Sequence, residues 1–293
     1  MKYGFVYEHR HIWPVRTICS VLRVSRSGFY DWHGRLPSQR QQSNERLLKR
    51  IEECFIVSRK TYGSPRVTQD LLAQGERCSL NRVARLMRQA GMQGRQRRRY
   101  VNRASTPSSR EVIAPNHLAR EFTALGPNKK WVADLTYAWT AEGWLYLAVI
   151  MDLYSRKIIG WSMQPSMSSQ LIIDATKMAY ASRGYPNSVL HHSDQGTQYT
   201  SKEFVAFLES YGALRSMSRR GNCWDNAAME SFFSTLKLEC LYRRRFKTRA
   251  EIRTTIFDYI ECFYNRHRRH SANGYLSPCD FEARASQAKA VSE

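Results

Sequence analysis

Three carboxylates could carry chemistry because of where they fall in the hydrophobic pattern of the chain. Asp134 lies in the middle of the apolar run WVADLTYAW, Asp194 ends the run SVLHHSD, and Glu230 follows within a helical stretch. A carboxylate in a buried strand is costly unless it is paired or binds a metal ion, and the strand of Asp134 contains no cation. Oxygen ligands suit hard divalent ions such as Mg²⁺ and Mn²⁺. These acids predict a divalent-metal site, and the competing interpretation is three unrelated structural acids.

The elements that must position these acids read as a mixed sheet. Three successive β-type runs, separated by the short breaks AEG and YS, are typical of an antiparallel meander: WVADLTYAW, WLYLAVIMDL and RKIIGWSM. A helix is expected at about 168–182, a strand at SVLHHSD, a helix at about 201–211, a strand near ALRSMS and a long helix from Asp225. Strands followed by alternating helices and strands predict an α/β fold with a mixed sheet.

The residues before this region have a helical pattern. Residues 12–33 contain two short apolar helical stretches around the break RVS, which fits a helix-turn-helix as well as an ordinary pair of packed helices. A second helical block covers about 42–92. Within it, Ser79 can cap a helix that places Arg82, Arg85 and Arg88 on one face.

The charge of the chain is large and uneven. Its net charge is +21, and residues 1–130 hold 26 basic and 9 acidic side chains, against 9 and 10 in 131–240 and 11 and 6 in 241–293. This excess suggests a nucleic-acid partner. The arginine stripe is followed directly by four more arginines, which favours phosphate contacts over a merely solvated helix face: Arg95, Arg97, Arg98 and Arg99.

These patterns divide the chain into five segments. We expect a helix-turn-helix-like segment at 1–40, a basic helical DNA-binding domain at 41–100, a linker at 101–125, a catalytic core at 126–240 and a helical extension at 241–293. No stretch approaches the roughly 18 apolar residues of a membrane span, and the N-terminus lacks the pattern of a signal peptide. A cytoplasmic protein without membrane association is therefore expected. Seven scattered cysteines without a CxxC pair favour reduced thiols.

Four motifs carry a resemblance to a known family. They are WVADLTY, HHSDQGTQY, GNCWDNAAMESFFSTLKLE and YNRHRRHSANGYLSPCDFE. In this order they resemble the second-reading-frame transposases of the copy-out, paste-in bacterial insertion sequences, from about residue 40 to about residue 284. Asp134, Asp194 and Glu230, with 35 residues between the last two, look like the Asp, Asp, Glu triad that this family shares with retroviral integrases. The resemblance implies a ribonuclease-H-like core with a five-stranded sheet.

The resemblance also implies the chemistry and the site residues. Two Mg²⁺ ions, with Mn²⁺ as a possible substitute, would serve an in-line phosphoryl displacement, first by water and then by the freed 3′-hydroxyl. Asp134 would bridge both ions, with Asp194 completing one site and Glu230 the other. Lys237, two helical turns after Glu230, would contact DNA near the cleaved bond, unless it is merely solvated. Asn226 shares the face of Glu230 and would contact DNA or orient that acid.

Other polar residues near the motifs receive structural interpretations. We expect Asp225 to be a helix N-cap and Asp152 to pair with Arg156. His191 and His192 are at least as consistent with a structural role as with DNA contact.

The implied partners are double-stranded DNA, further copies of the chain on paired element ends, and an upstream-frame protein or a fusion with it. The chain shows no heptad seam of its own, and Asn273 stands where the family more often has an apolar residue. Two alternatives stay open from the residues alone. One is a nuclease of the same fold that never joins strands, and the other is a DNA-binding regulator whose acidic site is idle.

Overall fold

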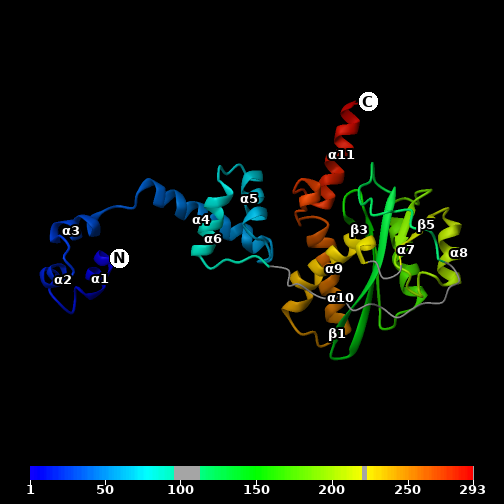
Figure 1. Cartoon of the computed structure of the whole chain (residues 1–293), viewed down its shortest axis with the longest axis horizontal. Helices are drawn as coiled ribbons and strands as arrows, with labels where there is room; N and C mark the ends of the chain where they lie inside the picture. The colour runs from blue at the N-terminus through cyan, green and yellow to red at the C-terminus, as the bar shows by residue number, and fades with distance from the viewer. Residues whose placement is uncertain (96–112, 220–222, 293) are drawn as a thin grey trace.

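A computed structural model describes residues 1–95, 113–219 and 223–292. Figure 1 shows two helical units followed by a sheet with helices on both sides. The N-terminal unit surrounds a small apolar core of Val6, Ile18, Cys19 and Phe29. Its helices are α1 (Lys2–His9), α2 (Val15–Val21) and α3 (Arg26–Gly34). Of these, α1 has no counterpart in the sequence-based expectation.

The second unit contains the predicted basic helices. They are α4 (Gln39–Val57), α5 (Ser64–Ala73) and α6 (Leu80–Gln89). The predicted cap of α6 is present, because the Ser79 hydroxyl accepts a hydrogen bond from the Arg82 amide at 3.3 Å. Val83, Leu86 and Met87 bury the apolar face of this helix.

The predicted mixed five-stranded sheet is confirmed. Its strands are β1 (Lys130–Thr140), β2 (Gly143–Asp152), β3 (Lys157–Gln164), β4 (Leu190–Ser193) and β5 (Leu214–Met217). They lie in the order β3-β2-β1-β4-β5. The first three form the antiparallel meander, whereas β4 runs parallel to β1 and β5 runs parallel to β4.

Both faces of this sheet are covered, so alternate side chains enter different cores. One face packs on α7 (Ser169–Ser182) and α8 (Lys202–Ser210) and the other on α9 (Ala227–Glu239) and the C-terminal helices (Figure 1). Along β2, Ala148 and Ile150 lie in the core with α7 and α8. Leu147 and Val149 lie in the core with α9.

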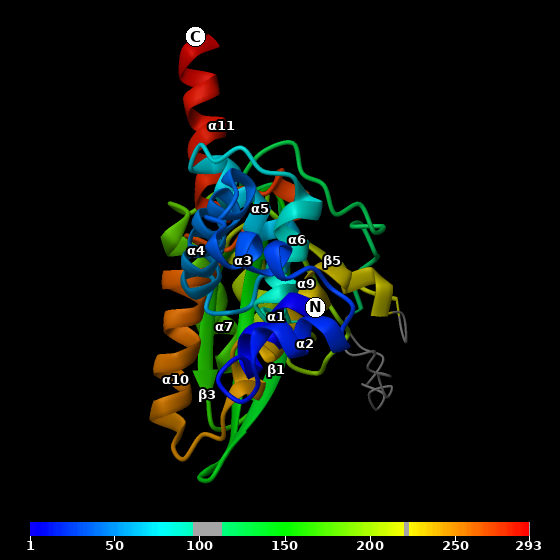
Figure 2. The same cartoon turned by 90° about the vertical axis from the view of Figure 1, so that its left-hand side faces the viewer.

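The C-terminal segment closes the α9 face of the sheet. It contains 3-10 turns at Leu241–Arg243 and Ser271–Asn273, α10 (Arg249–Phe257), a π-helical stretch at Asp258–Tyr264, and α11 (Pro278–Ser292). The far end of α11 extends away from the sheet in both views (Figures 1 and 2). The buried Asn265 side chain accepts from the Ile158 amide and donates to the Ile158 carbonyl, both at 2.9 Å, which satisfies the backbone of the edge strand β3. Asn273, which stands where the family more often has an apolar residue, is also buried and donates a hydrogen bond to the Ser155 carbonyl at 2.7 Å.

The described part of the predicted linker, residues 113–125, packs on the sheet domain. This segment contacts the sheet domain, because Leu118 is fully buried and its amide donates to the Ser216 hydroxyl at 3.1 Å. Its apolar contacts, at Ala114, Leu118, Phe122 and Ala124, follow neither the period of a helix nor that of a strand, so the sequence pattern gave no sign of them. Arg97, Arg98 and Arg99 lie outside the described residues.

Two expected local contacts are also different. Asp152 pairs with Arg183 at 3.3 Å, whereas Arg156 supplies only its backbone amide to the Asp152 carbonyl. The helix expected from Asp225 begins at Ala227, and Asp225 lies in a preceding 3-10 turn. Among the residues that the structure describes, none of the helices combines the length and apolar composition of a bilayer-crossing segment.

Candidate active site

The pairing of β1 with β4 brings two of the predicted acids to the same place. In this parallel pair, Val132 lies opposite His192. Continuing that register by two residues places Asp134 opposite Asp194, on the sheet face that α9 covers. Neighbouring strands lie about 4.8 Å apart. Two carboxylates separated by 60 residues in the chain therefore meet at the carboxyl end of β4.

Each of these aspartates is oriented by a backbone amide. Asp134 accepts a hydrogen bond from the Leu135 amide at 2.7 Å, and Asp194 accepts one from the Gly196 amide at 2.9 Å. A Cβ atom at Gly196 would lie 3.0 Å from the Asp194 carboxylate oxygen. A side chain at position 196 would press against the carboxylate, so glycine leaves the space that this turn requires.

The helix α9 adds the third acid and a lysine. It packs against the sheet through Met229, Phe232 and Leu236. Glu230 and Lys237 lie on the same face of α9, two turns apart. Both side chains act electrostatically on the Asp134 carboxylate. The Lys237 ammonium also lies 5.8 Å from the centre of the Tyr137 ring.

The electrostatics of the site are those of crowded carboxylates. Burial and then the neighbouring charge of Asp194 raise the pKa of Asp134 well above its ordinary value, and Glu230 adds to this shift. Burial likewise raises the pKa of Asp194. Burial lowers the pKa of Lys237, while the attraction of Asp134 opposes that shift. The site thus concentrates negative charge that a bound cation would offset.

Tyr199 is a further residue of this site that sequence analysis missed. Its ring is buried, and no described residue forms a hydrogen bond with its hydroxyl. Burial, Asp134 and Asp194 together raise the pKa of this phenol well above its ordinary value, so Tyr199 stays neutral beside the acids. Its place in the motif HHSDQGTQY, five residues after Asp194, was the available signal.

The segment before α9 is held by buried polar contacts. Asn226 is buried and donates a hydrogen bond to the Ala133 carbonyl at 3.2 Å. It therefore ties the start of α9 to β1 beside Asp134. Asp225 is not an N-cap, because its buried carboxylate pairs with Arg120 at 2.8 Å and with Arg219 at 3.0 Å. These contacts lower the pKa of Asp225 far below its ordinary value.

The two histidines next to Asp194 are structural. His192 is buried between the hydroxyls of Ser216 and Ser218, at 2.9 and 3.1 Å. His191 is buried against the ring of Phe204. Burial lowers the pKa of His192 to about 4 and that of His191 to about 3, so both rings are neutral at neutral pH.

The donor set of the site fits a hard divalent ion. Asp134 and Asp194 offer carboxylate oxygens whose like charges raise the pKa of Asp134. Within the described ranges, no three His, Cys, Asp or Glu side chains are grouped closely enough to hold one metal ion. The structure brings the two aspartates together, with Glu230 nearby on α9.

The predicted DNA-contacting arginines lie in the second helical unit. Arg85, Arg88 and Arg95 are exposed. Arg82 is only partly exposed, because its guanidinium donates to the side chains of Asn44 at 2.9 Å and Ser43 at 2.8 Å. Three of the four described arginines are therefore accessible to a phosphate backbone, and Arg82 already has partners within the protein.

Comparisons with protein families agree with this arrangement. Residues 124–223 match the family described as integrase core domain, residues 230–285 match a second family of the same description, and residues 42–100 match an HTH-like domain. The chain is 44% identical over 284 residues to transposase InsF for insertion sequence IS3A of Escherichia coli strain K12, covering 96% of this chain and 98% of the relative. It is also 44% identical over 271 residues to the IS600 uncharacterized 31 kDa protein of Shigella sonnei, covering 92% and 99%.

Solved structures of viral integrases show a more distant likeness. One is the simian T-cell lymphotropic virus intasome in complex with PP2A regulatory subunit B56 gamma, with 16% identity, a TM-score of 0.45 and coverage of 75% of this chain and 70% of that chain. Another is the HTLV-2 integrase catalytic core domain in complex with magnesium, in its dimeric form, with 19% identity, a TM-score of 0.39 and coverage of 54% and 98%.

Proposed function

Since this chain belongs to the IS3-family transposases, which are DNA transposases with an integrase core, we propose that the acidic site at β1 and β4 performs both chemical steps of transposition. In the first step a DNA strand is cut at the end of the element, which frees a 3′-hydroxyl. In the second step that hydroxyl attacks a phosphodiester of the target and joins the strands.

The observation that carries this proposal is the meeting of Asp134 and Asp194 at the end of β4, with Glu230 near enough on α9 to act on Asp134. Asp134 comes from β1, Asp194 from the end of β4 and Glu230 from α9. Burial raises the pKa of Asp134, and the charges of Asp194 and Glu230 raise it further. Such a cluster costs folding free energy and is typical of a functional site. A structural ion pair would combine opposite charges, as Asp225 does with Arg219.

The metal ions follow from the family and from the donor set. Integrase cores depend on metal ions, and we assign two Mg²⁺ ions, replaceable by Mn²⁺, to Asp134, Asp194 and Glu230. Bound there, such ions would activate the attacking oxygen and stabilise the leaving oxygen. Asp134 would contact both ions, and the amides of Leu135 and Gly196 hold the two aspartates in orientation.

Residues around the acids bind and orient the DNA strand. Lys237 lies beside Asp134 and would contact a phosphate next to the reacting bond. Its positive charge would offset the negative charge of that phosphate. Asn226 holds the first turn of α9 to β1 and so positions Glu230. Tyr199 is buried in the core that α7 and α8 cover, and its phenol stays neutral beside the two aspartates.

The proposed partners follow from the same assignment. The HTH-like domain implies DNA binding, which we place on the exposed arginines Arg85, Arg88 and Arg95 and on Arg97–Arg99. We further propose that several copies of the chain assemble on paired element ends, together with or fused to an upstream-frame protein. The transposase would act in the bacterial cytoplasm, on chromosomal DNA.

A strand-joining assay tests the proposal. Duplexes from both flanks of the gene are incubated with the intact chain and Mg²⁺ or Mn²⁺, with and without the upstream-frame protein. The intact chain is expected to yield joined strands, and Glu230→Gln is expected to bind the same duplexes without producing them. Glu203→Gln, on the exposed first turn of α8, is the matched control and should join strands normally.

The products identify the competing activities. Nicked strands without joined ones would indicate a nuclease. The absence of any metal-dependent product, even with the upstream-frame protein, would indicate a DNA-binding protein with an idle site. Joined strands that persist in Glu230→Gln would overturn the assignment of the third acid.

A further inference from the structure

The N-terminal unit has a core of its own and precedes the HTH-like domain at 42–100. Its three helices contact one another pairwise. Val6 of α1, Ile18 of α2 and Phe29 of α3 fill its centre. This unit is therefore a separate small fold, and the transposition chemistry at the acidic site leaves it without a role.

The connection between α2 and α3 is a rigid helix-turn-helix. The Val24 amide donates to the Cys19 carbonyl at 3.0 Å and the Arg23 amide to the Ser20 carbonyl at 3.1 Å, with Arg23 left-handed at φ +52°. These are the paired hydrogen bonds of a Schellman end for α2. The Ser25 hydroxyl then caps α3 by accepting from the Gly28 amide at 3.2 Å. The turn is fixed from both sides, so the angle between the helices is fixed too.

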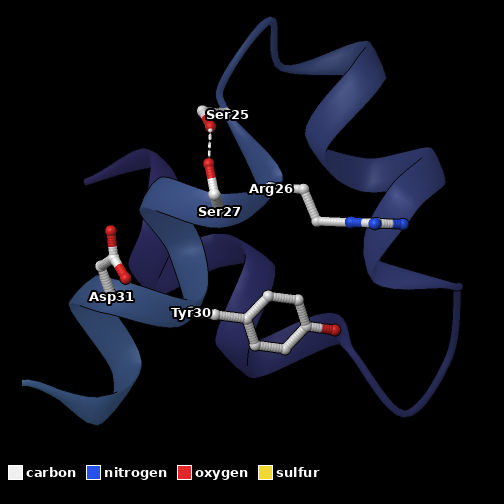
Figure 3. A pocket seen from close by; sticks show the side chains of 5 residues that line it. All are labelled: Ser25, Arg26, Ser27, Tyr30 and Asp31. Atoms are coloured by element: carbon white, nitrogen blue, oxygen red, sulfur yellow. Dashed lines mark hydrogen bonds between the residues drawn. The ribbon is translucent and has the colours of Figure 1, made fainter.

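One side of α3 is buried and the other is open. Phe29 is 1% exposed and faces the core, whereas Tyr30 is 55% exposed. Exposed polar side chains line a recess at the start of this helix: Ser25, Arg26, Ser27, Tyr30 and Asp31. Arg26 and Tyr30, four residues apart, extend in the same direction from α3 (Figure 3).

The chemistry of this surface fits a DNA duplex. Residues 1–40 contain seven Lys and Arg and two Asp and Glu, so the unit is basic. In a helix-turn-helix, the first residues of the second helix contact base edges in the major groove, and the first helix crosses the backbone. Arg26 can donate two hydrogen bonds to a guanine, and Asp31 can accept one from a cytosine amino group. A carboxylate at that place would repel phosphates, which favours contact with bases.

We propose that α3 is a recognition helix and that this unit reads a DNA sequence through Arg26, Ser27, Tyr30 and Asp31. Arg16, exposed on the first turn of α2, contacts the adjacent phosphates. The chain then grips DNA at two places, with base recognition by residues 1–34 and backbone binding by α6. This division of labour is independent of the acidic site and of the strand-joining reaction.

The test is a selection of bound sequences from a library of random duplexes, made with the full chain. The intact chain is expected to enrich one motif. Arg26→Lys keeps the charge but loses the two-pronged contact to a guanine, so the preference for that motif over a shuffled duplex should fall about tenfold while binding to the shuffled duplex stays. Asp31→Asn should change the preferred base at one position of the motif.

Arg35→Ala is the matched control, because Arg35 is exposed at the opposite end of α3. It should enrich the same motif as the intact chain. Far-ultraviolet circular dichroism checks that each variant keeps its helices. An unchanged motif in Arg26→Lys and Asp31→Asn, or no motif for the intact chain, would overturn the proposal. Strand joining by the intact chain is measured separately, so either result leaves the test of the acidic site unaffected.

Discussion

At the scale of single residues, aspartates of the same core have opposite electrostatic environments. Burial raises the pKa values of Asp134 and Asp194, and neighbouring carboxylates raise that of Asp134 further. Asp225 has a lowered pKa because two arginines donate to it. The first environment favours a bound cation, whereas in the second the cations are already supplied by the protein.

Replacing Asp194 by Asn should therefore abolish metal binding without harming the fold. The loss of its charge beside Asp134 is expected to raise the stability of the metal-free protein by about 1 kcal/mol. Mn²⁺ should increase the melting temperature of the intact chain and leave that of Asp194→Asn unchanged, as measured by calorimetry. Asp174→Asn is the control and should keep the Mn²⁺ response; Asp174, on α7, accepts hydrogen bonds from the side chains of Gln164 and Gln170. A Mn²⁺ response that survives in Asp194→Asn would remove this acid from the metal site.

Replacing Asp225 by Asn should destabilise the protein by about 2 kcal/mol at neutral pH, since a buried charge pair is lost and its arginines are partly solvated. The folded pKa of Asp225 is below its ordinary value of 3.8, so its stabilisation is present above that value and is lost as the pH falls through the folded pKa. The difference in unfolding free energy between the intact chain and Asp225→Asn should thus shrink below about pH 4. Urea unfolding at several pH values measures it, and a difference that does not vary with pH would contradict the pairing.

At the scale of elements, α6 presents arginines in two different states. Arg85 and Arg88 are exposed, whereas Arg82 is hydrogen-bonded to α4 through Asn44 and Ser43. The regular three-residue spacing in the sequence therefore does not distinguish Arg82, which has a structural role, from Arg85 and Arg88, which are free to contact DNA.

Salt dependence separates these two roles. In a plot of the logarithm of DNA affinity against that of salt concentration, Arg85→Ala and Arg88→Ala should each reduce the slope by about 1, because each removes a phosphate contact. Arg82→Ala should change the slope little and instead lower the unfolding free energy by about 1 kcal/mol, through its lost hydrogen bonds. Neutralising Arg97–Arg99 should also reduce the slope. Fluorescence anisotropy with a labelled duplex measures these slopes, and an equal slope for all variants would move the DNA interface away from α6.

At the scale of the whole molecule, the C-terminal segment joins the second helical unit to the core. Tyr62, in the connection between α4 and α5, accepts a hydrogen bond from the Arg269 amide at 2.7 Å, and the Arg269 guanidinium pairs with Asp70 on α5. Farther along, Arg59 pairs with Asp258 at 2.6 Å. These contacts couple the arginines of α6 to the sheet that carries the acids.

Arg269→Ala should loosen this coupling without unfolding the core. Its pair with Asp70 and its hydrogen bond to the Tyr275 carbonyl are lost, so amides of α5 should exchange with solvent at least about tenfold faster, while amides of β1 and β2 stay protected. Hydrogen exchange followed by mass spectrometry resolves the two regions. Arg266→Ala, at an exposed arginine three residues earlier, should leave both unchanged. Faster exchange throughout the sheet would show that Arg269 stabilises the whole fold.

The sequence by itself determined the order of the helices and strands after α1, the mixed sheet and the basic N-terminal region, and it predicted the three acids. Period-2 and period-3.6 hydrophobic patterns are local, and so they can be read along the chain. Motifs such as HHSDQGTQY are local too. The excess of arginine at 79–99 can likewise be found by counting charged residues along the sequence.

Only the tertiary structure decided which polar groups meet. The β1–β4 register places Asp134 beside Asp194, and buried Asn226 donates a hydrogen bond to β1. Asp225 forms ion pairs with Arg120 and Arg219. Asp152 pairs with Arg183 instead of Arg156. These partners are far apart in the chain or outside any repeating pattern, and hydrogen-bond geometry leaves no periodic trace in the sequence. The packing of Leu118 and the hydrogen bonds of Arg82 to α4 could not be predicted from the sequence either. A single buried contact depends on which residues surround it in space, and these come from distant parts of the chain.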